Sequence, residues 1–148
     1  MYEYKISNIV KIIDGDSLRV DLDLGFKIQL SNATLRLHGI DTPESRQRRR
    51  LEERKLGIKA KEFLVNILEG NKDNLIMKAT ERGKFGRILA EIFIDSTDNP
   101  SVNQLLIEAD LARPYFGGGK NELGPWTKEE NGIWYRYTNN NGYVEIKE

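Results

Sequence analysis

The 148-residue sequence contains no cysteine, and His38 is its only histidine. Without cysteine the chain has no disulfide bonds, no thiolate metal site and no cysteine nucleophile. A single histidine also excludes a metal centre built from several imidazoles. These two absences remove the thiol enzymes and the multi-histidine metalloproteins from consideration.

Long hydrophobic runs are absent as well, and none approaches the ~20 apolar residues that a helix needs to cross a bilayer. The first residues, Met1 to Lys5, contain no apolar signal-peptide core. We therefore expect an intracellular, cytoplasmic protein with no membrane partner. The length, the 39% hydrophobic content and the 31% charged content suit one globular domain. Since no oligomerisation signal is present, we expect a monomer.

An excess of positive charge is also missing, because 23 basic residues are balanced by 23 acidic ones. Strong nucleic-acid binders usually carry a basic excess, so any such function here depends on a local patch. The segment Ser45–Lys55 is the candidate, with six basic residues against two acidic ones. It is either a solvated loop or helix start, which we favour for a charge run, or a rim that attracts phosphate.

What the sequence does contain is a series of strand patterns. Ile6–Ile13 is rich in β-branched residues, and Ser17–Leu24 alternates apolar and polar side chains. After a turn, the strand pattern continues at Lys27–Leu30 and Leu35–His38, with a break expected at Ser31-Asn32. These patterns predict a meander of antiparallel strands.

Two helices and two further strands follow the meander. Apolar residues recur at helical spacing over Leu56–Leu68 and Val102–Ala109, and Ser101 is placed to cap the second helix. Between the helices, Leu75–Ala79 and Arg87–Asp95 have strand patterns. Five strands interrupted by a helix after the meander are typical of an OB-fold. We predict a mainly β, α+β protein with a five-stranded Greek-key barrel and two to three helices.

The barrel domain is expected to occupy residues 1–116, and residues 117–148 to form an irregular C-terminal extension packed on the same domain. Its first part, with Gly117–Gly119 and Asn121, favours an irregular loop. The part that follows is too rich in aromatic residues for a free tail. We expect it to fold back on the domain, with a hairpin turn at Asn139–Gly142.

The strand around Arg36 leads into a corner at residues 40–44 that is suited to chemistry. Pro43 has no amide donor and holds the preceding residue extended, so Asp41 and Glu44 leave the strand on a stiff corner. A guanidinium and two carboxylates in this arrangement can serve as phosphate clamp, metal ligand and general base. A polar turn with a surface ion pair is the alternative.

Asp16 and Arg87 each lie at the start of a predicted strand. The strand that contains Arg36 is the next element that can pair beside Asp16, so a normal hairpin would bring Asp16 and Asp41 together. Arg87 follows directly after Gly86. With the corner, these residues would supply two arginines and three carboxylates, a set suited to cleaving a phosphodiester.

Three short segments resemble the signature motifs of the staphylococcal nuclease-like (thermonuclease) family. They are Ile13-Asp14-Gly15-Asp16-Ser17, Arg36 with Ile40-Asp41-Thr42-Pro43-Glu44, and Phe85-Gly86-Arg87. Their order and internal spacing match the family, and the resemblance covers roughly residues 5–116. Three motifs in the right order are far more specific than any one of them.

The resemblance implies an OB-fold and a calcium-dependent nuclease that acts on DNA and RNA, cuts endonucleolytically and leaves 3′-phosphate ends. By motif position, one Ca²⁺ ion would be held by the carboxylates of Asp16 and Asp41 and by the backbone carbonyl of Thr42. Other divalent metals would also suit such oxygen ligands.

The resemblance also assigns residues that would act on the substrate. Arg36 and Arg87 would grip the scissile phosphate, and Glu44 would activate the attacking water. Lys84 is placed to meet a terminal phosphate. Tyr115 lies near the tyrosines that contact the nucleotide in the family, but about one residue out of register.

A second class of function stays open, a non-catalytic OB-fold module that binds nucleic acid or protein. Relatives of this kind have lost the active site. The discriminating feature is the complete set of acids and arginines, for which a binding module has no chemical need: Asp16, Arg36, Asp41, Glu44 and Arg87. We therefore favour the nuclease.

Overall fold

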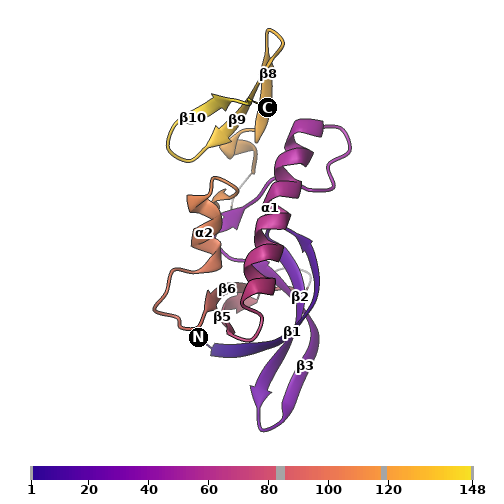
Figure 1. The fold of residues 1–148 in the computed structure, drawn as a ribbon, viewed down its shortest axis with the longest axis vertical. Helices are drawn as coiled ribbons and strands as arrows, with labels where there is room; N and C mark the ends of the chain where they lie inside the picture. The colour runs from indigo at the N-terminus through magenta and orange to yellow at the C-terminus, as the bar shows by residue number, and fades with distance from the viewer. Residues whose placement is uncertain (1, 83–85, 118–119, 148) are drawn as a thin grey trace.

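A computed structural model describes residues 2–82, 86–117 and 120–147 of the chain. Within these residues five strands close into a barrel in the order β1-β2-β3-β6-β5 (Figure 1). β3 and β6 run parallel, and the other neighbouring strands run antiparallel. The prediction of a mainly β, α+β protein with an OB-fold-like barrel is confirmed. The strands are β1 (Tyr2–Asp14), β2 (Ser17–Gly25), β3 (Ile28–Leu37), β5 (Leu75–Arg82) and β6 (Ile88–Ile94).

The core of the barrel follows from the alternation of side chains along its strands. On β2, Leu18, Val20 and Leu22 are buried, and the residues between them are more exposed. β3 adds Leu35 and Leu37, which are also buried. Each such side chain contributes about 1.5–3 kcal/mol when it is fully buried. The barrel is therefore a stable frame for the polar residues at its strand ends.

The break that we expected at Ser31-Asn32 is wrong, because β3 runs through both residues. The β2–β3 register shifts there, so that two residues of β3 lie opposite Asp21 as a β-bulge. Asn32 has a φ of 56°, and its N–H donates to the Asp21 carboxylate over 2.8 Å. Asparagine tolerates this backbone better than most residues, so the chain bulges instead of ending the strand.

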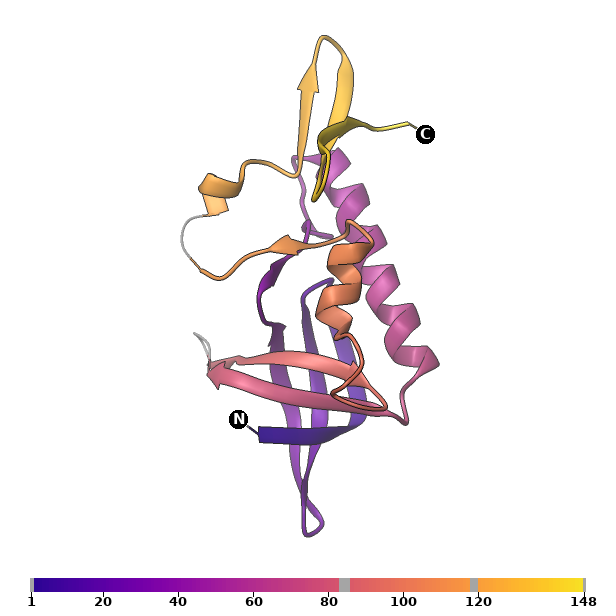
Figure 2. The same cartoon turned by 90° about the vertical axis from the view of Figure 1, so that its left-hand side faces the viewer.

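Helix α1 (Leu51–Gly70) lies alongside the barrel and extends beyond it (Figures 1 and 2). Its buried residues include Leu56, Ala60, Leu64 and Leu68, which confirms the predicted spacing. The helix begins at Leu51, so the basic segment before it is part loop and part helix start. No helix among the described residues is long and apolar enough to cross a membrane.

Helix α2 (Val102–Glu108) begins with the predicted cap, since Ser101 Oγ accepts a hydrogen bond from the Gln104 N–H over 3.1 Å. The two-residue strand β7 (Arg113–Pro114) follows and pairs antiparallel with β4 (Ile40–Asp41). This pairing places the chain that follows α2 directly beside the corner of candidate residues.

The last part of the chain forms a small sheet at the end of the molecule opposite the β2–β3 turn (Figure 2). The hairpin turn predicted at Asn139–Gly142 is present, but the sheet has a third strand that we did not predict. The segment is therefore more regular than expected, while the domain boundary at residue 116 stays a prediction. The elements are η2 (Lys120–Leu123, a 3₁₀ helix), β8 (Thr127–Glu130), β9 (Ile133–Thr138) and β10 (Gly142–Glu145).

Candidate active site

Asp16 and Arg36 form the first half of the site because the hairpin places them on neighbouring strand ends. Ser17 is the register partner of Arg36, and the Leu37 N–H donates to the Asp16 carbonyl over 2.8 Å. Arg36 Nη1 lies 3.1 Å from Asp16 Oδ2, with both side chains 12% exposed. The pairing that hairpin order predicted for these two segments is confirmed.

The guanidinium of Arg36 is only partly used by the fold. Nη1 also donates to the Leu37 carbonyl over 3.1 Å, and Nη2 donates to the Ile40 carbonyl over 3.0 Å. Together with the ion pair to Asp16, these bonds use three of the five N–H donors that a guanidinium carries. The remaining donor capacity can meet a phosphate oxygen.

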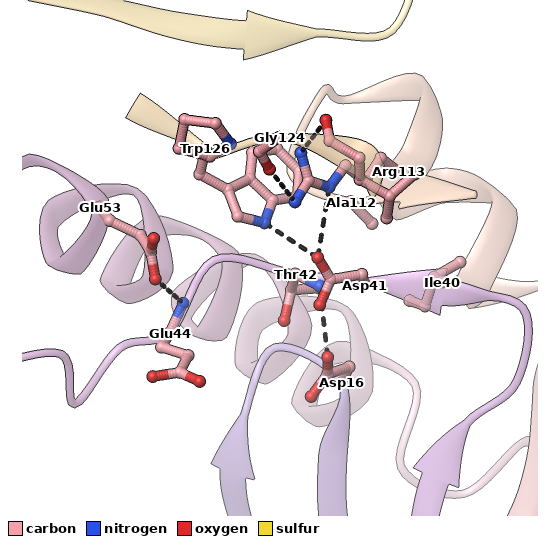
Figure 3. A network of polar contacts seen from close by, with 12 residues as sticks. Asp16, Ile40, Asp41, Thr42, Glu44, Glu53, Ala112, Arg113, Gly124 and Trp126 are labelled. Atoms are coloured by element: carbon pink, nitrogen blue, oxygen red, sulfur yellow. Dashed lines mark hydrogen bonds and ion pairs between the residues drawn. The ribbon is translucent and has the colours of Figure 1, made fainter. Parts of the chain in front are cut away.

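Asp41 supplies the second buried carboxylate. Strand β4 places it beside the β1–β2 turn, and Figure 3 shows its carboxyl next to that of Asp16. The next residue ties the two segments together, because the Thr42 N–H donates to Asp16 Oδ2 over 3.2 Å. Asp41 and Thr42 are both buried. The corner thus brings the two acids together, as the motif order suggested.

Two residues that we did not predict hold Asp41 in place. Arg113 Nε and Trp126 Nε1 each donate to Asp41 Oδ2 over 3.2 Å (Figure 3). The other Arg113 nitrogens donate to the carbonyls of Leu123 and Gly124 over 3.4 and 3.0 Å. The Arg113 guanidinium also lies over the Trp126 ring, 4.5 Å from its centroid. Because 72 and 85 residues separate these partners from Asp41, no local sequence pattern reveals them.

Each of the two buried acids has one arginine as its ion-pair partner. Burial raises the pKa of the Asp16 carboxyl, the Arg36 guanidinium opposes that rise, and the Asp14 carboxylate adds to it. Arg113 forms an ion pair with Asp41, as Arg36 does with Asp16. Formally, the two acids and their two arginine partners sum to zero charge. A divalent cation would bind at a site of zero formal charge most readily together with an anionic ligand.

Glu44 lies at the edge of the site with an exposed side chain. Its N–H donates to Glu53 Oε2 over 3.4 Å, and its carboxylate points away from Glu53 (Figure 3). Glu44 lines a pocket of about 340 Å³ together with Asp41 and Thr42. It therefore presents a carboxylate to solvent within reach of a ligand that occupies this pocket.

The backbone at Glu44 packs directly on α1 at Gly57. A Cβ atom on Gly57 would lie 2.3 Å from the Glu44 carbonyl carbon and 2.4 Å from the Ser45 nitrogen. These distances are far inside van der Waals contact. Asp14 Oδ1 also accepts from the Ser45 N–H, over 3.2 Å. The position of Glu44 thus depends on a glycine that helical periodicity does not single out.

Arg87 lies directly before β6 and is half-buried. In the parallel β3–β6 register Leu35 pairs with Ile88, so Arg87 lies one residue upstream of that pair. Arg36 lies one residue downstream of Leu35 on β3. Arg36 thus lies on β3, and Arg87 lies directly before the neighbouring strand β6.

Of the two residues expected to contact the nucleotide, the structure describes Tyr115 but not Lys84. The Tyr115 N–H donates to the Gly39 carbonyl over 2.9 Å, so Tyr115 lies at the end of β3 beside the corner. Lys84 and Phe85 lie outside the described residues. Their contribution to the site stays a prediction.

The donor set of the site consists of oxygen atoms, which suit a hard cation such as Ca²⁺ or Mg²⁺. A carboxylate has about four acceptor positions, so the hydrogen bonds to Asp16 and Asp41 do not by themselves prevent coordination. The described part of the chain has no cluster of three or more acidic or histidine side chains that would hold a metal. The residues fit a cation that takes its other ligands from water and from the substrate.

Comparison with known proteins shows what the chain is similar to. The family model described as staphylococcal nuclease homologue matches residues 34–132, so the turn that carries Asp16 lies before the match. A protein of Methanocaldococcus jannaschii, itself described as uncharacterized, is 30% identical over 134 residues, covering 78% of this chain. The chain spans 61% of the length of that curated relative. Because the family model matches well over half of the sequence, the chain belongs to the family of staphylococcal nuclease homologues.

Proposed function

We propose that the protein is a calcium-dependent nuclease that cuts DNA and RNA endonucleolytically and leaves 3′-phosphate ends. The main support is the pair of adjoining buried carboxylates, Asp16 and Asp41, beside the exposed carboxylate of Glu44. Taking charged groups out of water costs several kcal/mol for each ion. A site for a metal and a phosphate gives such a pair a chemical role that stability alone does not require.

In this proposal Asp16 and Asp41 hold one Ca²⁺ ion through their carboxylates, and Thr42 adds its backbone carbonyl. When bound, the ion neutralises charge on the scissile phosphate. Because Arg36 and Arg113 already balance the two acids, we expect the ion to bind weakly until a phosphate supplies further negative charge. Metal and substrate should therefore bind cooperatively.

The chain's own residues supply the remaining chemistry. Glu44 accepts a proton from the attacking water, whose oxygen forms a bond to phosphorus. The bond from phosphorus to the 5′ oxygen breaks, and that oxygen leaves with its electron pair and takes a proton from solvent. Arg36 and Arg87 donate to the phosphate oxygens, where negative charge builds up in the transition state. Lys84 and Tyr115 would contact the flanking nucleotide.

A non-catalytic module that binds nucleic acid is the second candidate, and one observation favours it. Each buried acid already has an arginine partner, so the polar network is balanced without a metal. In such a module the network would be purely structural, and Glu44 would not act as a general base. The two candidates therefore differ in what a metal and Glu44 do.

Cleavage in different metals separates the two candidates. Degradation of single-stranded DNA and of RNA is measured in Ca²⁺, in Mg²⁺ and in excess chelator, with Glu44→Gln protein purified in parallel as a control for contaminating nuclease. We expect cleavage in Ca²⁺ that chelator abolishes, with 3′-phosphate on the products. Cleavage that survives chelation would contradict the metal requirement. Absence of cleavage in every metal, with DNA still bound, would establish the binding module.

Replacement of Gly57 by alanine should reduce turnover more than it reduces substrate affinity. The new Cβ cannot fit against the Glu44–Ser45 backbone, so that segment must move away from α1. A displacement of about 1 Å can cost about 10²-fold in rate, and overpacking typically costs about 1–3 kcal/mol of stability. Turnover and the free energy of unfolding are both measured. Gly70→Ala is the matched control, since nothing lies within 4 Å of its Cβ position. Normal turnover in Gly57→Ala would show that the position of Glu44 is not critical.

A further inference from the structure

A run of exposed arginines begins two residues after Glu44. We define the arginine segment as residues 46–54, which include the connection from the corner to α1 and the first turn of that helix. Figure 1 shows this connection at the end of α1 farthest from the β2–β3 turn. The arginines of the segment are all exposed to solvent: Arg46, Arg48, Arg49, Arg50 and Arg54.

The two acidic residues of the segment leave most of these arginines unpaired. Glu53 is buried and is engaged by Arg50 Nη1 over 3.4 Å and by the Glu44 N–H. Glu52 is engaged by Lys55 Nζ over 3.1 Å. Within residues 2–82, 86–117 and 120–147, no ion pair or hydrogen bond involves the guanidinium groups of the other arginines: Arg46, Arg48, Arg49 and Arg54. In a chain with no net charge, this is a local concentration of unpaired positive charge.

The candidate site opens toward this segment. The pocket beside Asp41 and Thr42 is also lined by Glu44, Gln47 and Arg50. One wall of the pocket is therefore part of the arginine segment. A strand of nucleic acid with a phosphate at the acid pair would place its neighbouring phosphates over Gln47, Arg50 and the exposed arginines beyond them.

We propose that the arginine segment binds the phosphate backbone of a polynucleotide on one side of the scissile bond. The proposal rests on the proposed nuclease function and adds a surface that contacts an extended strand but not a dinucleotide. Arginine gives bidentate, charge-assisted hydrogen bonds to phosphate oxygens. Backbone contacts of this kind add affinity without reading sequence, so the segment governs binding and not the chemical step.

The test compares two triple variants with the same change in charge. One is Arg46→Gln with Arg48→Gln and Arg49→Gln, which leaves Arg50 in the pocket wall. The control is Lys5→Gln with Lys27→Gln and Lys72→Gln. These lysines are exposed, and they lie on β1, on the β2–β3 turn and after α1, toward the opposite end of the molecule (Figure 2). Thermal unfolding confirms that both variants keep the fold.

Binding is measured by fluorescence anisotropy with a single-stranded DNA of about 20 nucleotides, in chelator, at several salt concentrations. Each phosphate contact to a single strand contributes about −0.7 to the slope of log K against log salt. We expect the arginine variant to reduce the magnitude of that slope by about 2, since it removes three such contacts. The lysine variant should keep the slope of the wild type.

Cleavage gives the second measurement. On the long strand the arginine variant should raise KM and leave kcat unchanged, and on a dinucleotide it should change neither. An unchanged salt slope would overturn the proposal, and so would an equal loss on both substrates, which would indicate distortion of the site. An equal loss of binding to polyglutamate would show a general anion surface and contradict the assignment to nucleic acid. Since binding is measured in chelator, a reduced slope without cleavage in any metal would support the surface and refute the nuclease.

Discussion

Replacing Arg113 with methionine is expected to lower the free energy of unfolding by about 3–5 kcal/mol, the range typical of breaking a buried ion pair. Methionine keeps much of the apolar stem of the arginine side chain but has no hydrogen-bond donor. Asp41 would lose the partner that lies 3.2 Å from its Oδ2 and would remain buried with its charge. The carbonyls of Leu123 and Gly124 would lose their donors as well.

Urea unfolding in the presence of chelator measures this change without a contribution from bound metal. Arg113→Lys is a demanding comparison, because lysine keeps the charge but lacks the planar fork that reaches three acceptors and stacks on Trp126. We expect lysine to restore only part of the loss. Adding Asp41→Asn to Arg113→Met should recover stability, since the buried charge is then gone. A loss below about 1 kcal/mol in Arg113→Met would show that Asp41 is not held as a buried charge.

Replacing Glu44 with glutamine is expected to reduce turnover by about 10²–10⁴-fold, the usual contribution of a positioned general base. Glutamine has nearly the same shape, and the Glu44 side chain is exposed, so the fold should not change. The backbone bond from the Glu44 N–H to Glu53 also remains. Substrate affinity should therefore stay close to that of the wild type.

Single-turnover cleavage in Ca²⁺ measures the rate of the chemical step, and DNA binding in chelator measures affinity. Glu69→Gln, an exposed substitution near the end of α1, is the matched control and should behave as the wild type. Near-normal cleavage by Glu44→Gln would remove Glu44 from the mechanism. An equal loss of cleavage and binding would assign Glu44 to substrate binding instead.

The parts of the site that lie close together in sequence could be predicted from it. Alternation and turn residues placed Asp16 at one strand end and Arg36 on the partner strand, and the register confirms that pairing. The stiff corner after β3 placed Asp41 and Glu44, because proline restricts the backbone locally. Local steric and hydrogen-bonding rules were sufficient for these residues.

The remaining parts depend on packing between distant segments. Arg113 and Trp126 reach Asp41 across 72 and 85 residues, and neither stands in a pattern that names its partner. Gly57 matters only because the Glu44–Ser45 backbone crosses α1 at that position. The bulge at Asn32 replaced a predicted break because the partner strand supplied Asp21 as a hydrogen-bond acceptor. In each case the decisive contact comes from another element of the fold.

The hydrogen bond from Trp126 to Asp41 links tryptophan fluorescence to the state of the site. The chain has two tryptophans, and they differ sharply: Trp126 is 4% exposed and donates to Asp41, whereas Trp134 is 42% exposed. Indole emission depends on the polarity and hydrogen bonding around the ring. We expect an ion or a phosphate that draws on the Asp41 carboxylate to change the emission of Trp126 more than that of Trp134. Occupancy of the acid pair can thus be followed by fluorescence, with no label and no cleavage of substrate.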